Sequence, residues 1–270
     1  MLEFGTLSKL TGNSIYYDKA KYAVTEVFNR RSKIGLVGTT INVETGEWQN
    51  TETHISGMID SYYEYLIKAY LLFDDEDFKK MYDESISAVN KYLLDSANTG
   101  LWYAHANMNS GVKTQTVFGS LDAFMPAMLV LAGSIKTAEE IQESCFKMWT
   151  QFGIEPEEFN YKTFEVTAPY YILRPENIES AFYLYRATKN PKYLEMGKIF
   201  YNSIDKYCKV DEGFASLKSV MSKEKMDSME SFFLAETLKY LYLIFAPEET
   251  LDLNKSVFNT EAHPLKKMSK

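Results

Sequence analysis

The helical spacing of apolar residues is the feature that most restricts how this chain can fold. Apolar side chains recur at helical intervals in the first ten residues and in eight longer stretches. Gly, Asn, Asp and Pro lie between these stretches, where helices commonly end. The expected longer helices cover residues 14–30, 61–73, 76–94, 119–133, 136–150, 175–188, 191–207 and 228–245. The pattern therefore predicts an all-α fold.

Helical hairpins repeat along the chain, with small β-hairpins between some of them. Residues 7–16 are echoed by residues 184–193, and residues 71–78 form a looser third copy. The alternating patterns in residues 36–48 and 101–118 predict two β-hairpins. Repeated helical hairpins form either an open solenoid or a closed barrel. Uneven spacing and the inserted β-hairpins favour a closed αα-barrel.

Composition excludes several classes of function. The 270 residues are 46% hydrophobic and carry a net charge of -8, which predicts a large core and argues against binding to nucleic acid. No run approaches the ~20 apolar residues of a membrane span, and no signal peptide is visible. Cys145 and Cys208 are too few for a disulfide framework. His54, His105 and His263 lie far apart in the sequence, which disfavours a zinc hydrolase.

Two carboxylates follow Arg174 and Pro175. Pro175 suits the first position of a helix, and Glu176 and Glu179 then share a face of its first turn. These acids could simply complement the helix dipole. Alternatively, Arg174 could orient one carboxylate and keep it ionised, as a catalytic base requires.

A third carboxylate, Glu236, lies within an aromatic helix. It shares a helix face with Phe232, Phe233 and Tyr240. A buried carboxylate needs compensation by a cation or by ordered water. A surface position for Glu236 is the alternative interpretation.

Asp60 precedes a helix whose first turns are crowded with aromatic residues. Ser61 and Glu64 have the spacing of a capping box, so helix capping alone can explain the polar residues here. The aromatic residues of the following turn remain unexplained by capping.

A hydroxyl, a carboxylate and an imidazole gather near the C-terminus, at Thr260, Glu261 and His263. A frayed tail is the simplest interpretation of this segment. Taken with the other motifs, however, it suggests a site. Paired acids beside aromatic rings suit glycoside hydrolysis, and oxygen ligands without Cys or His suit Ca²⁺.

These motifs resemble the class I α-1,2-mannosidases of glycoside hydrolase family 47. The similar segments are residues 60–66, 173–180, 230–237 and 258–264, in family order. The resemblance implies an (αα)7 barrel that is incomplete at its N-terminus, within a single partial catalytic domain over residues 1–270. It also implies an inverting, Ca²⁺-dependent enzyme that removes α-1,2-linked mannose from high-mannose N-glycans.

The resemblance also implies a role for each matched residue. Asp60 and Glu176 are the two candidates for the base that activates water. Thr260 binds Ca²⁺ directly, and Glu261 binds it through water. The remaining residues contact the sugar or hold waters of the ion, with Phe232 as the platform for the mannose ring: Glu157, Arg174, Glu179, Phe232 and Glu236.

Residues 119–126 are more similar to the ER degradation-enhancing branch of the family, which implies the ER lumen and misfolded glycoproteins as partners. The processing branch has a cysteine where Ala123 stands, so Cys145 is expected to lack that disulfide. The family's general acid lies in a segment that precedes the Leu-Glu-Phe-Gly-like stretch, and Glu165 occurs in the wrong order to replace it. A mannose-binding, lectin-like module or a truncated product is therefore the alternative to a hydrolase.

Overall fold

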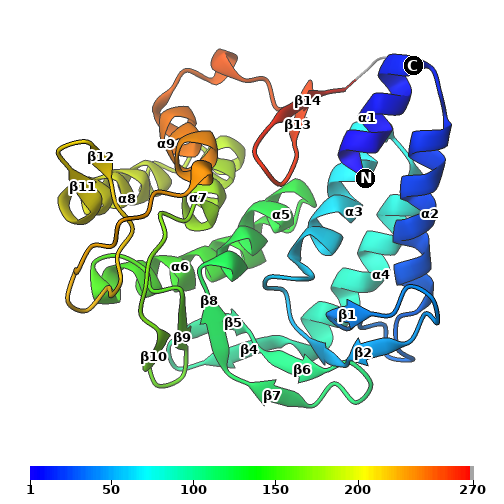
Figure 1. The fold of residues 1–270 in the computed structure, drawn as a ribbon, viewed down its shortest axis with the longest axis horizontal. Coiled ribbons are helices and arrows are strands. Elements are labelled where there is room, and N and C mark those ends of the chain that lie inside the picture. The colour runs from blue at the N-terminus through cyan, green and yellow to red at the C-terminus, as the bar shows by residue number, and fades with distance from the viewer. Residues whose placement is uncertain (268–270) are drawn as a thin grey trace. The chain divides into compact units, whose positions relative to one another are not determined.

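A computed structural model describes residues 1–267 of the chain (Figure 1). The chain folds as two compact units, and each is described by itself. Unit 1 comprises Met1–Leu94, Tyr103–Gln115 and the segment from Asp252 onward. Unit 2 comprises Asp95–Trp102 and Thr116–Leu251. The single catalytic domain over residues 1–270 stays a prediction.

Unit 1 is built on two helical hairpins, α1 with α2 and α3 with α4. The bounds are α1 Leu2–Thr11, α2 Ile15–Asn29, α3 Asp60–Phe73 and α4 Glu76–Tyr92. Three small sheets accompany them, with strand orders β1-β2, β3-β6-β7 and β13-β14. Their strands are β1 Thr40–Ile41, β2 Trp48–Asn50, β3 Glu52–Thr53, β6 His105–Asn107, β7 Lys113–Gln115, β13 Ser256–Phe258 and β14 Pro264–Lys266. The β1-β2 and β6-β7 pairs confirm the two predicted hairpins.

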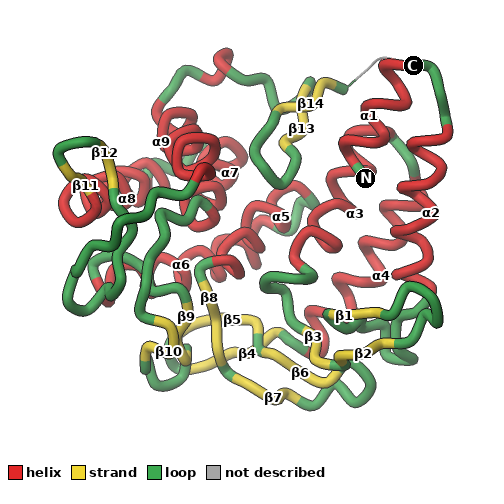
Figure 2. The backbone as a smooth tube through the Cα atoms, viewed as in Figure 1, coloured by secondary structure: helices red, strands yellow, loops and turns green. Residues whose placement is uncertain are grey.

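Unit 2 is organised around α7, which packs against α5, α6, α8 and α9. Its helical elements are η1 Leu121–Phe124, α5 Met125–Leu131, α6 Ile135–Phe152, α7 Glu176–Thr188, α8 Lys192–Cys208, the π-helix η2 Phe233–Thr237, α9 Leu238–Phe245 and η3 Glu248–Thr250. The strands are β8 Val117–Gly119, β9 Glu158–Asn160, β10 Val166–Ala168, β11 Lys209–Val210 and β12 Gly213–Phe214. The chain passes between the units at β4 Leu94–Ala97 and β5 Gly100–Tyr103. All strands are short beside the helices (Figure 2).

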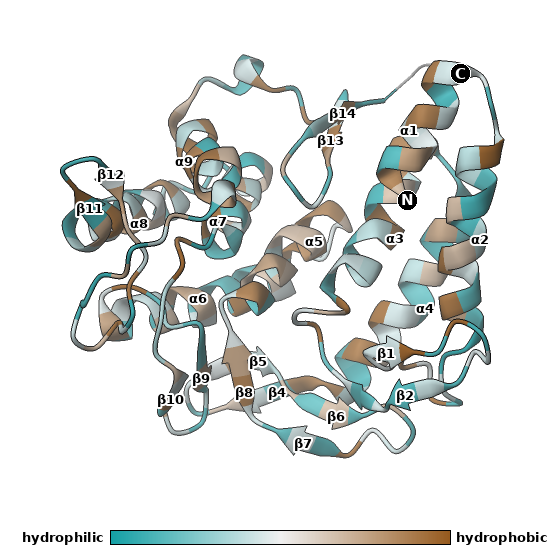
Figure 3. Ribbon diagram, in the orientation of Figure 1, coloured by the Kyte–Doolittle hydropathy of each residue, from teal (hydrophilic) through white to brown (hydrophobic). Residues whose placement is uncertain are grey.

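The core of unit 2 explains why α7 lies at its centre. Residues 177–184 of α7 are all buried, although a surface helix would expose one face. The neighbouring α5 is apolar along its length and shows brown in Figure 3. Trp149 of α6 and Phe200 of α8 pack with their ring centroids 4.5 Å apart, and both are fully buried. Burying each large apolar side chain stabilises the fold by about 1.5–3 kcal/mol.

The three similar helical hairpins share one backbone feature. In each, the first helix ends at a residue in the left-handed conformation: Gly12 (φ 72°), Asp74 (φ 56°) and Lys189 (φ 58°). This conformation turns the chain sharply and ends the helix. The structure therefore confirms the repeated helix–turn–helix units expected from the sequence.

Two expected helices begin later than the pattern predicted. Gly119 pairs with Glu158 in the β8-β9 ladder, so the helix expected over 119–133 is replaced by a strand, a short 3-10 turn and then α5. The helix expected over 228–245 begins only at residue 231 and continues into the π-helix η2, because the carbonyl of Ser228 accepts from the backbone N–H of Ser216 at 2.8 Å. In both places, backbone hydrogen bonds to another segment replace the first part of the expected helix.

No helix within residues 1–267 is long and apolar enough to cross a membrane. Cys145 and Cys208 are both buried and form no disulfide.

Candidate active site

In unit 2, Arg174 and Glu157 form a two-pronged ion pair. Arg174 donates from Nη2 to Glu157 Oε1 at 2.6 Å and from Nε to Oε2 at 3.1 Å. The side chains are only 15% and 12% exposed, so water competes little for these bonds. Ser120 Oγ also donates to Glu157 Oε2, at 3.1 Å. The contact of Arg174 with its sequence neighbour Glu176 is thus secondary, because Glu157 accepts both hydrogen bonds from the Nε–Nη2 edge of the guanidinium.

Glu176 begins α7 beside this pair. Its Oε1 lies 3.8 Å from Arg174 Nη1, and the side chain is 12% exposed. Its buried Oε2 has no hydrogen-bond partner among residues 1–267. Burial raises the pKa of Glu176 well above its ordinary value, in spite of the attraction of Arg174. Burial therefore favours the neutral form of the Glu176 carboxyl group.

An aromatic ring, Phe232, directly precedes η2, and a second buried acid, Glu236, lies within it. The Arg174 guanidinium lies over the Phe232 ring, 5.4 Å from its centroid, which is a cation–π distance. Glu236 is 8% exposed within the π-helix, so the surface interpretation of this residue is wrong. A π-helical turn is rare and occurs frequently at functional sites.

The other acid of α7, Glu179, is also buried. It is 8% exposed, and its Oε1 accepts a hydrogen bond from the Tyr240 hydroxyl of α9 at 2.9 Å. Glu176 and Glu179 do share one face of the first turn, as the spacing predicted. Their burial shows that this face is packed against protein and is not merely a solvated helix end.

In unit 1, Asp60 starts α3, and its Oδ1 accepts from the backbone N–H of Ser61 at 2.8 Å. The proposed capping box is wrong, because Ile59 occupies the cap position and no side chain caps the helix. Glu64 instead forms a buried ion pair with Lys68, one turn further along α3. These side chains are 8% and 2% exposed, so each charge depends on the other.

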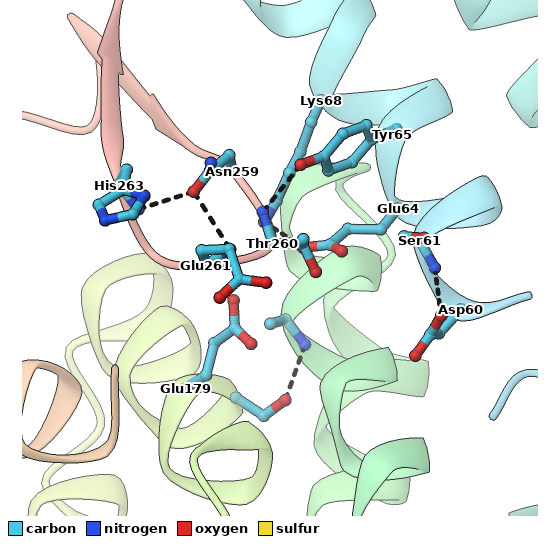
Figure 4. Close-up of polar contacts among 12 residues, drawn as sticks. Asp60, Ser61, Glu64, Tyr65, Lys68, Glu179, Asn259, Thr260, Glu261 and His263 are labelled. Carbon is cyan, nitrogen blue, oxygen red and sulfur yellow. Dashed lines mark hydrogen bonds and ion pairs between the residues drawn. The ribbon is translucent and has the colours of Figure 1, made fainter. Parts of the chain in front are cut away.

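Thr260 and Glu261 occupy the turn between β13 and β14, so this segment is a structured hairpin rather than a frayed tail. Asn259 Oδ1 accepts from the backbone N–H groups of Glu261, at 3.1 Å, and His263, at 2.7 Å. The Thr260 N–H donates to the hydroxyl of Tyr65 in α3 at 3.2 Å (Figure 4). The bonds to Asn259 fix the turn itself and the bond to Tyr65 holds it against α3, while the Thr260 and Glu261 side chains stay exposed.

The Thr260 turn is anchored further by Glu3. Glu3 Oε1 accepts from Tyr65 Oη at 2.7 Å and from Asn259 Nδ2 at 3.0 Å. Burial alone would raise the pKa of Glu3, but the hydrogen bond from Tyr65 and that from Asn259 outweigh it and lower the pKa. An ionised Glu3 therefore links α1, α3 and the Thr260 turn.

Strained backbone occurs next to three of the four motifs. Seven non-glycine residues among those described have a positive φ angle. Two of them, Asp74 and Lys189, are the helix ends described above. Three of the others are Met58, two residues before Asp60, Leu173, directly before Arg174, and Ala262, directly after Glu261. Such conformations cost of order 1–3 kcal/mol and cluster at functional sites. The sequence carries no sign of them, because none of these three residues is Gly or Asn.

A group of potential metal ligands, Glu52, His54 and His105, also lies in unit 1. Their ligand atoms all lie within 4.8 Å of one another. The His54 and His105 rings stack with centroids 4.4 Å apart, so distance in sequence was a poor guide to these histidines. His54 Nδ1 accepts from the Ser56 N–H at 3.1 Å, which places the hydrogen of a neutral ring on Nε2. The pKa of His54 is lowered to about 4. Burial is the main cause, and the neighbouring His105 ring is the second cause.

Comparisons with known proteins identify the family of this chain. The family model for glycosyl hydrolase family 47 matches residues 1–267. The chain is 42% identical to α-mannosidase I MNS5 of Arabidopsis thaliana over 271 residues, which cover 100% of this chain and 46% of that protein. It is 39% identical to human ER degradation-enhancing α-mannosidase-like protein 2, with 98% and 49% covered. The chain spans about half the length of these curated relatives.

A solved structure shows the same fold. The α-1,2-mannosidase from Trichoderma reesei superposes with a TM-score of 0.89 at 31% identity, covering 99% of this chain and 64% of that one. The helical α/α-barrel predicted from the sequence, incomplete in this chain, is thereby confirmed. The chain belongs to glycosyl hydrolase family 47.

Proposed function

We propose that this chain forms part of an inverting, Ca²⁺-dependent α-1,2-mannosidase that trims high-mannose N-glycans. The group of Glu157, Arg174, Glu176 and Phe232 carries the proposal, because it combines a protonatable carboxyl, a fixed guanidinium and an aromatic ring in unit 2. Glycoside hydrolysis needs carboxyl groups that transfer protons, and sugar rings stack on aromatic faces.

Glu176 is the proposed proton-transferring residue of this group. As a general base it must be ionised, whereas its burial favours the neutral form. Additional positive charge beside Glu176 would favour the ionised form. Asp60 is the other candidate for the base. Inverting enzymes hold their acid and base about 6.5–9.5 Å apart, which leaves room for the attacking water.

The neighbouring side chains would bind and orient the sugar. Phe232 offers a ring face to mannose, with Arg174 held beside it by Glu157. Carboxylates accept hydrogen bonds from sugar hydroxyls, which is the role proposed for Glu157, Glu179 and Glu236. The burial of Glu179 and Glu236 keeps bulk water from competing for these bonds.

Thr260 is the proposed direct ligand of Ca²⁺, and Glu261 would bind the ion through water. The donor chemistry fits, since the hydroxyl and carbonyl of Thr260 and the carboxylate of Glu261 are the oxygen ligands that Ca²⁺ prefers. The hydrogen bonds that its backbone N–H groups donate to Asn259 and Tyr65 keep this turn in a fixed conformation. When bound, Ca²⁺ would supply positive charge and orient water and sugar hydroxyls.

The proposed setting is the ER lumen, with misfolded glycoproteins as the carriers of the glycan. Support comes from the relatives that are named ER degradation-enhancing α-mannosidase-like proteins. A lectin-like, non-hydrolytic mannose-binding module is the second candidate function. It is favoured by the ion pair of Arg174 with Glu157 and by the ring of Phe232, because these groups can bind a sugar without any proton transfer.

One experiment separates these candidates. Mannose release from a high-mannose N-glycan is measured with and without Ca²⁺ for the parent chain and for Glu176→Gln. Binding of α-1,2-linked mannobiose is measured in parallel by calorimetry. Ca²⁺-dependent release that is lost in the variant supports the hydrolase, and Ca²⁺-dependent binding without release supports the lectin-like module. A chain that neither binds nor cleaves the glycan contradicts both.

A further inference from the structure

Glu155 is a fully buried carboxyl group to which the roles above assign nothing. It lies in the loop between α6 and β9 and has no solvent-exposed surface. Its Oε1 has no hydrogen-bond partner among residues 1–267. A buried ionised carboxylate with one oxygen unpaired is strongly disfavoured, so both the placement of Glu155 and its charge require an explanation.

The other oxygen of Glu155 has a definite partner. Asn177 Nδ2 donates to Glu155 Oε2 at 2.9 Å and to the backbone carbonyl of Cys145 at 3.1 Å. Asn177 Oδ1 in turn accepts from Gln142 Nε2 at 2.8 Å. Asn177 is fully buried and follows Glu176 directly in the first turn of α7. Its side chain therefore fixes this turn between α6 and the loop that carries Glu155.

The charged surroundings of Glu155 are unbalanced. The charges of Glu157 and Arg174 influence the pKa of Glu155. Glu155 in turn influences the pKa values of Glu176, Cys145 and Tyr171. Three carboxyl groups thus share one guanidinium, and Glu157 occupies two of its donors. Arg174 cannot neutralise all three, which favours at least one neutral carboxyl in the group.

We propose that Glu155 is a positioning residue of the site, whose neutral carboxyl holds Asn177 and so fixes the turn of α7 that presents Glu176. The inference rests on the proposed function, because it assigns Glu155 a role in placing the proton-transferring group. Glu155 acts through Asn177. Because Glu155 is neutral, it adds no further negative charge near Glu176.

The titration of Glu155 agrees with this geometry. Burial raises the pKa of Glu155 to about 8, against the hydrogen bond from Asn177, which lowers it. The native carboxyl therefore keeps its proton at pH 7, whereas the unfolded one loses it near 4.5. Since the folded state binds more protons between these values, stability falls as pH rises from about 4.5 to about 8 and then levels off.

The first test measures stability and needs no mannosidase activity. Melting temperature is followed from pH 5 to pH 9 for the parent chain, Glu155→Gln and the exposed control Glu165→Gln. Gln keeps an acceptor for Asn177 but is neutral at every pH. The melting temperature of Glu155→Gln is expected to rise relative to that of the parent up to about pH 8, because Glu155 is ionised in the unfolded parent and protonated in the folded parent over this range. The control should follow the parent throughout.

A double-mutant cycle tests the contact with Asn177. Glu155→Ala and Asn177→Ala are combined, and the loss of stability of the double variant is expected to be smaller than the sum of the two single losses. If Glu155→Ala does not fold, the cycle is run with Glu155→Leu in its place. Strictly additive losses overturn the inference, whether or not the chain acts on mannosides.

Kinetics then tests positioning. Glu155→Ala is expected to lower kcat on the order of tenfold to a hundredfold with little change in KM, because small misplacement of a reacting group is costly. Glu155→Gln should restore most of the loss. An unchanged kcat in Glu155→Ala overturns the inference. A parent chain that neither binds nor cleaves mannosides contradicts the proposed function instead, and the stability cycle still decides the Glu155–Asn177 contact.

Discussion

Arg174 binds Glu157, seventeen positions before it in the chain, more closely than it binds its near neighbour Glu176. The distances are 2.6 Å from Nη2 to Glu157 Oε1 and 3.8 Å from Nη1 to Glu176 Oε1. Glu157 therefore fixes the orientation of the guanidinium, and Glu176 meets its remaining edge. This leaves Glu176 close to a positive charge without a direct hydrogen bond to it.

Replacing Arg174 by Lys is expected to weaken both stability and glycan binding. Lys cannot make two parallel hydrogen bonds to Glu157 or lie flat over Phe232. The expected loss of stability is about 1.5–3 kcal/mol, the range for hydrogen bonds to charged groups. Urea unfolding measures it, with Arg30→Lys, in the more exposed pair with Glu26, as the matched control. Equal losses in the two variants would contradict the special role of the Arg174 pair.

Removing the hydroxyl of Thr260 is expected to weaken the response to Ca²⁺. A ligand that binds only the folded state raises its stability, by about 2.7 kcal/mol at a hundred times Kd. Thr260→Ala should therefore show a smaller rise in melting temperature on addition of Ca²⁺ than the parent. Thr250→Ala, in the exposed turn η3, serves as control. A parent chain whose melting curve is the same with Ca²⁺ and with chelator would refute the proposed metal site.

Breaking the buried pair of Glu64 and Lys68 is expected to be costly. Lys68→Met leaves a carboxylate that is 8% exposed without its cation, so a loss of about 3–5 kcal/mol is expected. Combining it with Glu64→Gln removes the uncompensated charge and should recover much of that loss. Denaturant unfolding of the parent and the three variants measures the recovery. A double variant no more stable than Lys68→Met would contradict the pairing.

Both thiols are expected to resist alkylation in the native protein. Burial raises the pKa of Cys145 well above its ordinary value and that of Cys208 to about 12, and the thiolate is the reactive form. Treatment with iodoacetamide at pH 8 should label neither cysteine until denaturant is added, when both become reactive. Mass spectrometry of the labelled chain gives the count. Rapid labelling of Cys145 in the native state would show that its surroundings open to solvent.

Much of the fold follows from local pattern. The helices, the β1-β2 and β6-β7 hairpins and the repeated helical units were all predictable, because apolar spacing and turn residues act over a few neighbouring positions. The four motifs were also visible as residue patterns. The late start of α5 and the non-helical conformation of residues 228–230 were not, since backbone hydrogen bonds to other segments decided them.

The sequence by itself determined most of the helical segments, which carboxylates share a helical turn and to which family the chain belongs. Only the tertiary structure decided that Arg174 pairs with Glu157, that Glu155 is buried against Asn177 and that His54 stacks on His105. The physical reason is one of range. Helical periodicity is a property of adjacent residues, whereas the burial and pKa of a carboxyl group depend on side chains that the folded chain brings in from distant positions.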